Sequence, residues 1–335
     1  MTVRICVAIG DKDFSRLYDR DSIARLEALG EVVRPPADAS GTVPLPAEIG
    51  DDFDVLITSW STQPFDPGVV RGSRLRLAVH SAGSVRTLFP RETLGHEMRL
   101  AQGGSDAMAE AVAEMAVTMT LALLRNLTLH DRRFQATRSW REGGTGILGQ
   151  SIAAQRIGIV SLSRVGRHYL RMIQGLGVSR IGIHDPYATA ADATELGIEL
   201  RSLDDLCAES DVLAVHAPST PSTAGMIGRR QLALLRDGGV LINTARAEVT
   251  DEQALIAELV DGRISAALDV YITEPLPSTS PLFGLENVLL TPHIAGGTVQ
   301  ARFAQGRSVV DEVQRFLRGQ SLLAEVTPHN YERLS

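Results

Sequence analysis

The second half of the chain places three polar side chains just beyond three short apolar runs. Arg246 follows the run GVLINT, Glu274 lies in the loop after AALDV, and His293 follows NVLLTP. In an open parallel sheet, ligands bind outside the carboxyl ends of the strands, so these side chains can point into one crevice. A guanidinium binds anions and an imidazole exchanges protons near neutral pH. Taken singly, they have ordinary interpretations as a surface arginine, a solvated glutamate and a buried structural histidine.

A second candidate site is the turn GIVSLSRVGRHYL, which follows the apolar run RIGIV. A dinucleotide-binding turn has the pattern G-x-G-x-x-G, because its glycines permit the tight turn and the close approach of a pyrophosphate. Ser161, Ser163 and Gly166 occupy the three glycine positions here, so two glycines are missing. By itself, this turn leaves dinucleotide binding open.

Asp185 strengthens the dinucleotide hypothesis. It ends the run RIGIH, about 20 residues past the turn, where an acidic side chain accepts hydrogen bonds from the adenosine ribose. A carboxylate there repels a 2′-phosphate, which favours NAD over NADP. The alternative is an aspartate that only starts an Asp-Pro turn.

The spacing of the apolar runs predicts the elements that position these residues. From Arg156 onward, runs rich in Ile, Val and Leu alternate with helical segments, which is typical of a doubly wound parallel sheet buried on both faces. The first hundred residues contain shorter runs, Val3–Ile9, Phe53–Thr58 and Leu75–His80, and predict a smaller α/β unit. We also expect helices over Asp106–Arg125, apolar on most faces, and Thr298–Gly319.

Composition limits the possible partners. The chain has 335 residues, 33 Lys and Arg against 40 Asp and Glu, and a net charge of −7, which gives no reason to expect nucleic acid or an anionic membrane. Cys6 and Cys207 are the two cysteines, so we expect neither a disulfide nor a cysteine-rich metal site. The N-terminus lacks the pattern of a signal peptide, and no apolar run is long enough to span a membrane. We therefore expect a cytoplasmic protein.

Several longer strings make the sequence recognisable. From about Asp106 to Gly297 the chain resembles the D-isomer-specific 2-hydroxyacid dehydrogenase family, which includes glycerate and phosphoglycerate dehydrogenases, through VHAPSTPSTAGMIG, LINTARAEVTDEQAL, AALDVYITEPLP and LLTPHIAGGT. The resemblance implies an α/β protein in which a Rossmann-type NAD domain, residues 106–298, is inserted in a smaller flavodoxin-like substrate domain, residues 1–105 plus 299–335. It also implies a homodimer and a 2-keto or 2-hydroxy acid substrate, and we expect no appended regulatory domain.

The same resemblance assigns roles to single residues. Arg246 would bind the substrate carboxylate and keto oxygen, His293 would be the acid–base group, and Glu274 would hydrogen-bond His293 and keep it charged for reduction. Gly83 and Ser84, in the string LAVHSAGSVR, would hold the carboxylate through backbone N–H groups. The NAD site would comprise Ser163, Arg164, Val165, Gly166, Asp185, Ala217, Pro218, Thr223, Thr244, Ala245 and Asp269.

Departures from the family pattern leave two other functions open. The Cβ of Ser161 conflicts with a tight turn, and Ala247 replaces a glycine usual after the catalytic arginine. We therefore expect NAD to bind about 1–2 kcal/mol more weakly. The alternatives are a non-enzymatic NAD(H)-sensing scaffold on the same fold and a decayed paralogue with impaired dinucleotide binding.

The identity of the substrate is not readable from the sequence. Its side chain would meet the loops Trp60–Gln63 and Ser81–Arg86. Arg86 could meet a second anionic group, although we favour a solvent-facing arginine. We interpret Trp60, Trp140 and His80 as packing residues, and His216 as structural or close to the cofactor.

Overall fold

The fold is described from a computed structural model, which covers residues 2–104, 106–144 and 146–331. The contacts divide the chain into two compact units, residues 1–108 with 297–335 (unit 1) and residues 109–296 (unit 2). The sequence analysis places the ends of the same segments at residues 105 and 299, whereas the contacts place them at residues 108 and 297.

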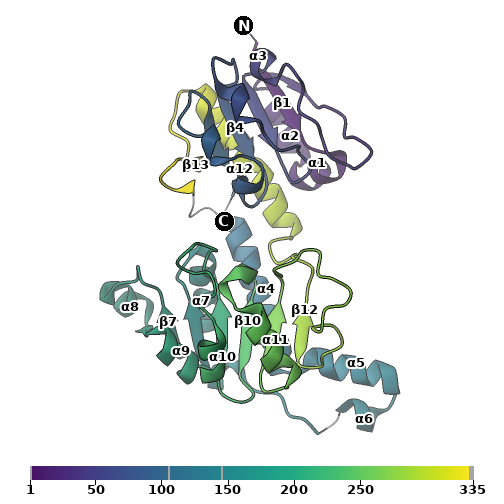
Figure 1. Ribbon diagram of the computed structural model, residues 1–335, viewed down its shortest axis with the longest axis vertical. Coiled ribbons are helices and arrows are strands. Elements are labelled where there is room, and N and C mark those ends of the chain that lie inside the picture. The colour runs from purple at the N-terminus through teal and green to yellow at the C-terminus, as the bar shows by residue number, and fades with distance from the viewer. Residues whose placement is uncertain (1, 105, 145, 332–335) are drawn as a thin grey trace. The chain divides into compact units, whose positions relative to one another are not determined.

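Unit 2 is built on a seven-stranded, fully parallel sheet (Figure 1). The strand order is β12-β11-β10-β9-β6-β7-β8, so the order reverses between β6 and β9, as in a doubly wound fold. The strands are β6 (Arg156–Val160), β7 (Arg180–His184), β8 (Glu199–Leu200), β9 (Val212–Val215), β10 (Val240–Asn243), β11 (Ser265–Leu268) and β12 (Val288–Leu290). The predicted fold class is confirmed; only the short edge strand β8 lacks an apolar run in the sequence.

Both faces of this sheet are buried, which explains the unbroken apolar runs. Along β9, Val212 and Ala214 pack into one hydrophobic cluster, whereas Leu213 and Val215 pack into another on the opposite face. Figure 1 shows α9, α10 and α11 on one face and α4 on the other. The helices are α5 (Leu127–Thr137), α6 (Trp140–Gly144), α7 (Arg164–Gly175), α8 (Ala190–Leu196), α9 (Leu203–Glu209), α10 (Arg229–Leu234) and α11 (Glu252–Val260).

Unit 1 contains a six-stranded sheet with the order β13-β5-β4-β3-β1-β2. All pairs are parallel except β13 with β5. The strands are β1 (Arg4–Ala8), β2 (Glu31–Val33), β3 (Val55–Thr58), β4 (Leu77–His80), β5 (Arg99–Gln102) and β13 (Glu325–Val326). The order 2-1-3-4-5 is flavodoxin-like, and its reversal lies between β1 and β3.

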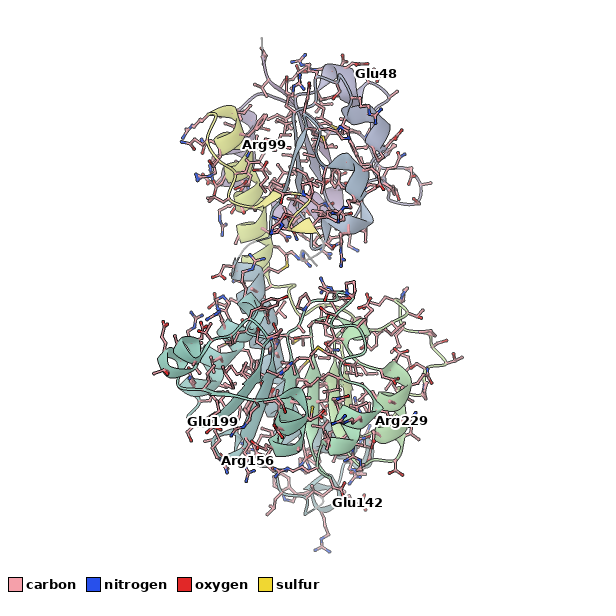
Figure 2. The ribbon with its side chains drawn as sticks, turned by 60° about the vertical axis from the view of Figure 1, so that its left-hand side comes forward. Glu48, Arg99, Glu142, Arg156, Glu199 and Arg229 are labelled. Atoms are coloured by element: carbon pink, nitrogen blue, oxygen red, sulfur yellow. The ribbon has the colours of Figure 1, made fainter. Side chains whose placement is uncertain are left out.

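Helices cover both faces of the unit 1 sheet as well. α1 (Asp11–Leu17), α2 (Arg20–Glu27) and α12 (Val299–Leu317) pack on one face, and α3 (Ile49–Asp52) lies on the other. The C-terminal segment is attached by an ion pair in which Arg99 Nε lies 2.7 Å from Glu325 Oε1, joining β5 to β13; Arg99 is labelled in Figure 2. The predicted C-terminal helix is confirmed as α12.

The predicted apolar helix is α4 (Asp106–Leu124). By length and composition it is the one helix among the described residues that could cross a membrane, which is weak evidence because core helices of soluble proteins pass the same test. Ala113, Ala116 and Met119 of α4 pack in the core of unit 2. Burial in the domain core is therefore sufficient to account for its apolar composition.

Candidate active site

Three loops at one edge of unit 2 carry the predicted catalytic residues. β10, β11 and β12 are neighbours, and Asn243 pairs with Leu268 and Leu268 with Leu290, so the three strands end side by side. Arg246 follows β10, Glu274 follows β11 and His293 follows β12. Since adjacent strands are about 4.8 Å apart, the three loops occupy one short stretch of the sheet edge.

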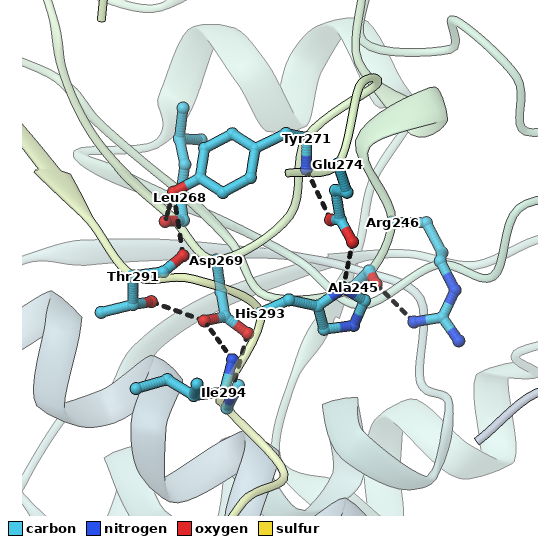
Figure 3. Close-up of polar contacts among 10 residues, drawn as sticks. Ala245, Arg246, Leu268, Asp269, Tyr271, Glu274, Thr291, His293 and Ile294 are labelled. Carbon is cyan, nitrogen blue, oxygen red and sulfur yellow. Dashed lines mark hydrogen bonds and ion pairs between the residues drawn. The ribbon is translucent and has the colours of Figure 1, made fainter. Parts of the chain in front are cut away.

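His293 and Glu274 form a hydrogen-bonded pair (Figure 3). The distance from His293 Nδ1 to Glu274 Oε2 is 2.8 Å, and Glu274 Oε1 accepts a bond of 3.0 Å from the backbone N–H of Tyr271. The carboxylate therefore has a fixed orientation, and it assigns the proton on Nδ1, which leaves Nε2 for proton exchange with a ligand. The side chains are 50% and 36% exposed, so a ligand can reach the pair.

The backbone of His293 is in an unusual conformation, with a φ of 52°. Asp269, which follows β11 and is fully buried, holds it there. Asp269 Oδ1 accepts a bond of 2.8 Å from Ile294 N, and Oδ2 accepts one of 2.8 Å from Ala295 N. Asp269 Oδ1 also accepts a bond of 2.5 Å from the Thr291 hydroxyl, so both sides of the histidine are fixed (Figure 3). Asp269 was predicted as a cofactor residue; the structure gives its carboxylate a positioning role.

The Arg246 loop is held by the side chain of Asn243. Asn243 receives a bond of 3.0 Å from Ala245 N and donates one of 3.0 Å to Arg246 O, which closes the turn after β10. Arg246 Nη1 donates to Ala245 O at 2.7 Å. Ala247 begins a 3-10 turn, Ala247–Val249, and is not among the residues with positive φ. The alanine in place of the usual glycine therefore causes no backbone strain.

The predicted dinucleotide turn joins β6 to α7. Ser163 is the N-cap of α7, and its hydroxyl accepts a bond of 3.3 Å from Gly166 N and donates one of 2.8 Å to His216 O. A Cβ on Gly166 would lie 2.1 Å from the Ser161 carbonyl oxygen, so only glycine fits there. The first-turn N–H groups of α7, at Arg164 and Val165, form the positive end of a helix and suit a pyrophosphate.

Ser161 adopts the conformation that glycine normally supplies, with a φ of 80°. Asp185, at the end of the neighbouring strand β7, stabilises the turn: its Oδ2 accepts bonds of 2.7 Å from Leu162 N and 3.2 Å from the Ser161 hydroxyl. Asp185 Oδ1 accepts a further bond of 2.8 Å from Tyr187 N. The carboxylate is held at the place where the adenosine ribose would lie, and the missing first glycine is accommodated.

The remaining predicted cofactor residues line the same edge of the sheet. Ala217, Pro218 and Thr223 follow β9, and Thr223 Oγ1 donates to Pro218 O at 2.5 Å. Thr244 and Ala245 follow β10, and the buried Thr244 hydroxyl has no hydrogen-bond partner within the described part of the chain. An orphaned hydroxyl at this edge and a turn that accepts only glycine at 166 fit a bound dinucleotide.

His216, also at this edge, is 3% exposed and packs against Tyr169 with ring centroids 4.8 Å apart. Burial lowers the pKa of His216 to about 3, so its imidazole is neutral. It is therefore unsuited to the acid–base role assigned to His293, in line with the interpretation from sequence.

The predicted substrate loop lies in unit 1, after β4. Gly83 O accepts a hydrogen bond from the Gln102 amide, and Ser84 caps the 3-10 turn Val85–Thr87. Nothing lies within 4 Å of a Cβ built on Gly83, so the backbone there is open to a ligand.

Some sequence interpretations need correction. Trp60 and Trp140 were expected to be packing residues, yet they are 52% and 86% exposed. His80 is buried and its Nδ1 lies 2.9 Å from the Thr58 hydroxyl, as expected of a packing residue. Sequence reasoning missed Tyr271, whose backbone orients Glu274 and whose hydroxyl donates to Leu268 O and Thr291 O, at 3.0 and 2.9 Å; no sequence signal marks it.

Comparison with known proteins agrees with this geometry. Residues 117–295 match the family description "D-isomer specific 2-hydroxyacid dehydrogenase, NAD binding domain". A D-3-phosphoglycerate dehydrogenase of Methanocaldococcus jannaschii is 31% identical over 306 residues, covering 90% of this chain and 56% of the relative. A glyoxylate reductase of Korarchaeum cryptofilum is 31% identical over 273 residues, covering 80% of this chain and 81% of the relative.

Solved structures show the same fold. A D-mandelate dehydrogenase of Rhodotorula graminis has a TM-score of 0.82 at 23% identity and covers 97% of this chain and 98% of its own. An NADPH-dependent glyoxylate/hydroxypyruvate reductase of Sinorhizobium meliloti has a TM-score of 0.79 at 26% identity, with 99% and 100% covered. The chain spans 39–56% of the length of the first phosphoglycerate dehydrogenases it matches. With an NAD-binding domain that matches over more than half of its length, the chain belongs to the D-isomer specific 2-hydroxyacid dehydrogenase family.

Proposed function

We propose that this protein is an NAD-dependent dehydrogenase that interconverts a 2-keto acid and a D-2-hydroxy acid. The His293–Glu274 pair, 2.8 Å apart at the edge of the sheet that also carries Arg246, is the observation that supports it most directly. Family membership and the turn at the N-terminus of α7, which suits a pyrophosphate, support NAD as the cofactor that such a reaction needs.

The proposed reduction needs one hydride and one proton. Bound NADH supplies the hydride to the keto carbon. His293 donates the proton from Nε2 to the keto oxygen, so the carbonyl becomes a hydroxyl and the imidazole becomes neutral. Glu274 fixes the orientation of the ring through the bond to Nδ1. Arg246 binds the substrate with its planar donor fork. As the family resemblance implies, the backbone N–H groups at Gly83 and Ser84 of unit 1 hold the substrate carboxylate.

NADH oxidation with glyoxylate, hydroxypyruvate and bulkier 2-keto acids tests this function. We expect turnover with at least one of them, and a fall in kcat of about 10²–10⁴-fold in His293→Ala, the range for removing a general acid. Binding of NADH, followed by its fluorescence, serves as the control and should survive in His293→Ala. Tight NADH binding without turnover on any keto acid would favour the sensing scaffold, and no NADH binding would favour a decayed paralogue.

We also propose that the protein is a homodimer, and exposed apolar side chains on and after α5 and α6 support this. Trp140 is 86% exposed and Leu148 is 87% exposed, and Leu127, Phe134 and Ile147 add to the same segment. α5 has no buried residue, yet it is fixed to unit 2 by the ion pair of Arg133 with Glu286. An ordered segment with this much exposed apolar surface is typical of a subunit contact.

Light scattering after size exclusion measures the mass directly. We expect a dimer for the unaltered chain and a shift toward monomer in Trp140→Glu. Arg141→Glu, one residue along the same helix, is the control for added charge and should leave the mass unchanged. A monomeric unaltered chain would refute the proposal.

A cytoplasmic location is a further proposal, and the two cysteines support it. Cys6 and Cys207 are free and buried, and burial raises the pKa of each thiol to about 12. Such thiols need no oxidising compartment. Cell fractionation with an antibody against the chain would test the location.

A further inference from the structure

A cation and an aromatic ring meet at the carboxyl edge of the unit 1 sheet. The Arg302 guanidinium carbon lies 4.3 Å from the centre of the Trp60 ring. Trp60 comes two residues after β3, and Arg302 is in the first turns of α12. The backbone N–H of Gly10, which follows β1, donates a bond of 3.0 Å to the Ser61 hydroxyl, so this pair stands close to the ends of β1 and β3. That is where the strand order reverses, the usual ligand position in a flavodoxin-like sheet.

Arg302 has no ion-pair partner among the described residues. Within residues 2–104, 106–144 and 146–331, no carboxylate forms an ion pair with it, and Nη1 donates only to the Gln305 amide oxygen, at 3.3 Å. Burial lowers the pKa of Arg302, Asp13 raises it and Arg16 lowers it further. Asp13 and Arg16 are thus an anion and a cation that act on this guanidinium with opposite effects.

Stacking on Trp60 does not account for this arrangement. A half-exposed cation–π contact contributes about 0.5–1 kcal/mol, whereas withdrawing a cation from water without a counter-ion costs more. Two other arginines of unit 1 show the contrast: Arg307, on the same helix, lies 3.0 Å from Asp19, and Arg74 lies 2.7 Å from Asp54. Arg302 instead has its guanidinium over the Trp60 ring and forms no ion pair with a carboxylate of the described residues, and a guanidinium has further N–H donors that suit a planar anion.

We propose that Arg302, stacked on Trp60, binds a second carboxylate on the substrate, so that the preferred substrates are short 2-oxo dicarboxylic acids. This rests on the proposed function, in which the loop after β4 holds the first carboxylate. β3 and β4 end in register, Thr58 beside His80, so the loop that carries Trp60 and the loop that carries Gly83 and Ser84 leave neighbouring strands. A single guanidinium pairs with one carboxylate through its planar donor fork. Arg86, the residue that the sequence offers for a second anion, already takes part in another interaction.

Steady-state kinetics with matched substrates tests the proposal. Oxaloacetate and 2-oxoglutarate carry the second carboxylate, pyruvate and 2-oxobutyrate lack it, and 3-phosphohydroxypyruvate carries a phosphoryl group instead. We expect the lowest KM for a dicarboxylate. Arg302→Met should raise that KM about 10–100-fold, as for loss of a charge-assisted pair, with kcat and the KM of the monocarboxylates little changed. Arg302→Lys should restore part of the difference.

Arg307→Met is the matched control, since it removes an arginine from the same helix and should leave the preference unchanged. Urea unfolding of each variant verifies that it folds. If Arg302→Met does not fold, Asp13→Asn gives the opposite test, because removing that anion should lower the KM for dicarboxylates about two- to threefold. Dicarboxylates no better than monocarboxylates, an equal loss for both in Arg302→Met, or an Arg302-dependent preference for the phosphorylated acid would overturn the proposal.

A binding measurement separates this proposal from the proposed function. The chain has two tryptophans, so Trp140→Phe leaves Trp60 as the only indole. We expect 2-oxoglutarate, but not 2-oxobutyrate, to change its fluorescence, and the change to disappear when Arg302→Met is added. A binding signal without turnover would refute the proposed reaction and retain the anion site, whereas turnover on monocarboxylates without this signal would do the reverse.

Discussion

Unit 2 contains two loops, each within three residues of a strand end, in which a residue other than glycine has a positive φ, and each is held by an aspartate that follows the neighbouring strand. Ser161, with a φ of 80°, is held by Asp185, and His293, with a φ of 52°, is held by Asp269. In each case the carboxylate accepts the backbone N–H of the next residue, at 2.7 Å from Leu162 and 2.8 Å from Ile294. The same device therefore serves the proposed cofactor turn and the proposed catalytic loop.

The two aspartates differ in their contact with water. Asp269 is fully buried and accepts three hydrogen bonds from the His293 loop, whereas Asp185 is only partly buried. A hydrogen bond to a buried charge is strong, and leaving its donors unsatisfied is costly, while water can replace a lost bond at an exposed site. We infer that the catalytic loop is rigidly fixed and that the cofactor turn is more tolerant of substitution.

Replacing each aspartate by asparagine gives the largest expected contrast. Asp269→Asn puts an amide NH₂ against backbone N–H donors in a dry site and should lower the free energy of unfolding by about 2–3 kcal/mol. Asp185→Asn should lower it by less than about 1 kcal/mol. Urea unfolding of both variants measures the difference. Similar losses, or a larger loss for Asp185→Asn, would contradict the inferred difference in rigidity.

The loops held by Asp185 and Asp269 also show which features of the site could be predicted from the sequence. The apolar runs predicted the buried strands, and the parallel sheet then placed Arg246, Glu274 and His293 at one edge. The role of Asp269 was not predictable, because it depends on which backbone N–H groups face the end of β11 once His293 takes a positive φ. Glycine usually signals that conformation, and neither loop has one there.

The short edge strands of both sheets and the exposure of the two tryptophans were also not predictable from the sequence. β2, β8 and β13 have two or three residues each, too few to form a recognisable apolar run. Trp60 and Trp140 were interpreted as packing residues because of their type, since the sequence alone does not distinguish an indole that packs inside its own unit from one presented on the surface.

Two substitutions of His293 test whether its positive φ strains the loop that Asp269 holds. His293→Gly and His293→Ala both remove the imidazole, so both should lower kcat by about the same 10²–10⁴-fold. Only glycine adopts a φ of 52° without a Cβ conflict, so His293→Gly should be more stable than His293→Ala by about 1 kcal/mol. Thermal or urea unfolding of the two variants measures it. Equal stability would indicate that Asp269 holds the loop without strain at this residue.

Ser161 provides the smallest expected effect and the most direct test of the tolerant turn. Ser161→Gly relieves the positive φ and removes side-chain atoms from a position where glycine lets a pyrophosphate approach the backbone, but it also loses the hydroxyl bond of 3.2 Å to Asp185. We expect NADH to bind more tightly by about 1 kcal/mol, roughly fivefold, when it is titrated by fluorescence. Ser161→Ala keeps the Cβ and loses the hydroxyl, so it should bind NADH no more tightly than the unaltered chain. Unchanged affinity in Ser161→Gly would mean that Asp185 compensates fully for the missing glycine. The turn at Ser161 would then be as firmly held by its aspartate as the His293 loop is by Asp269.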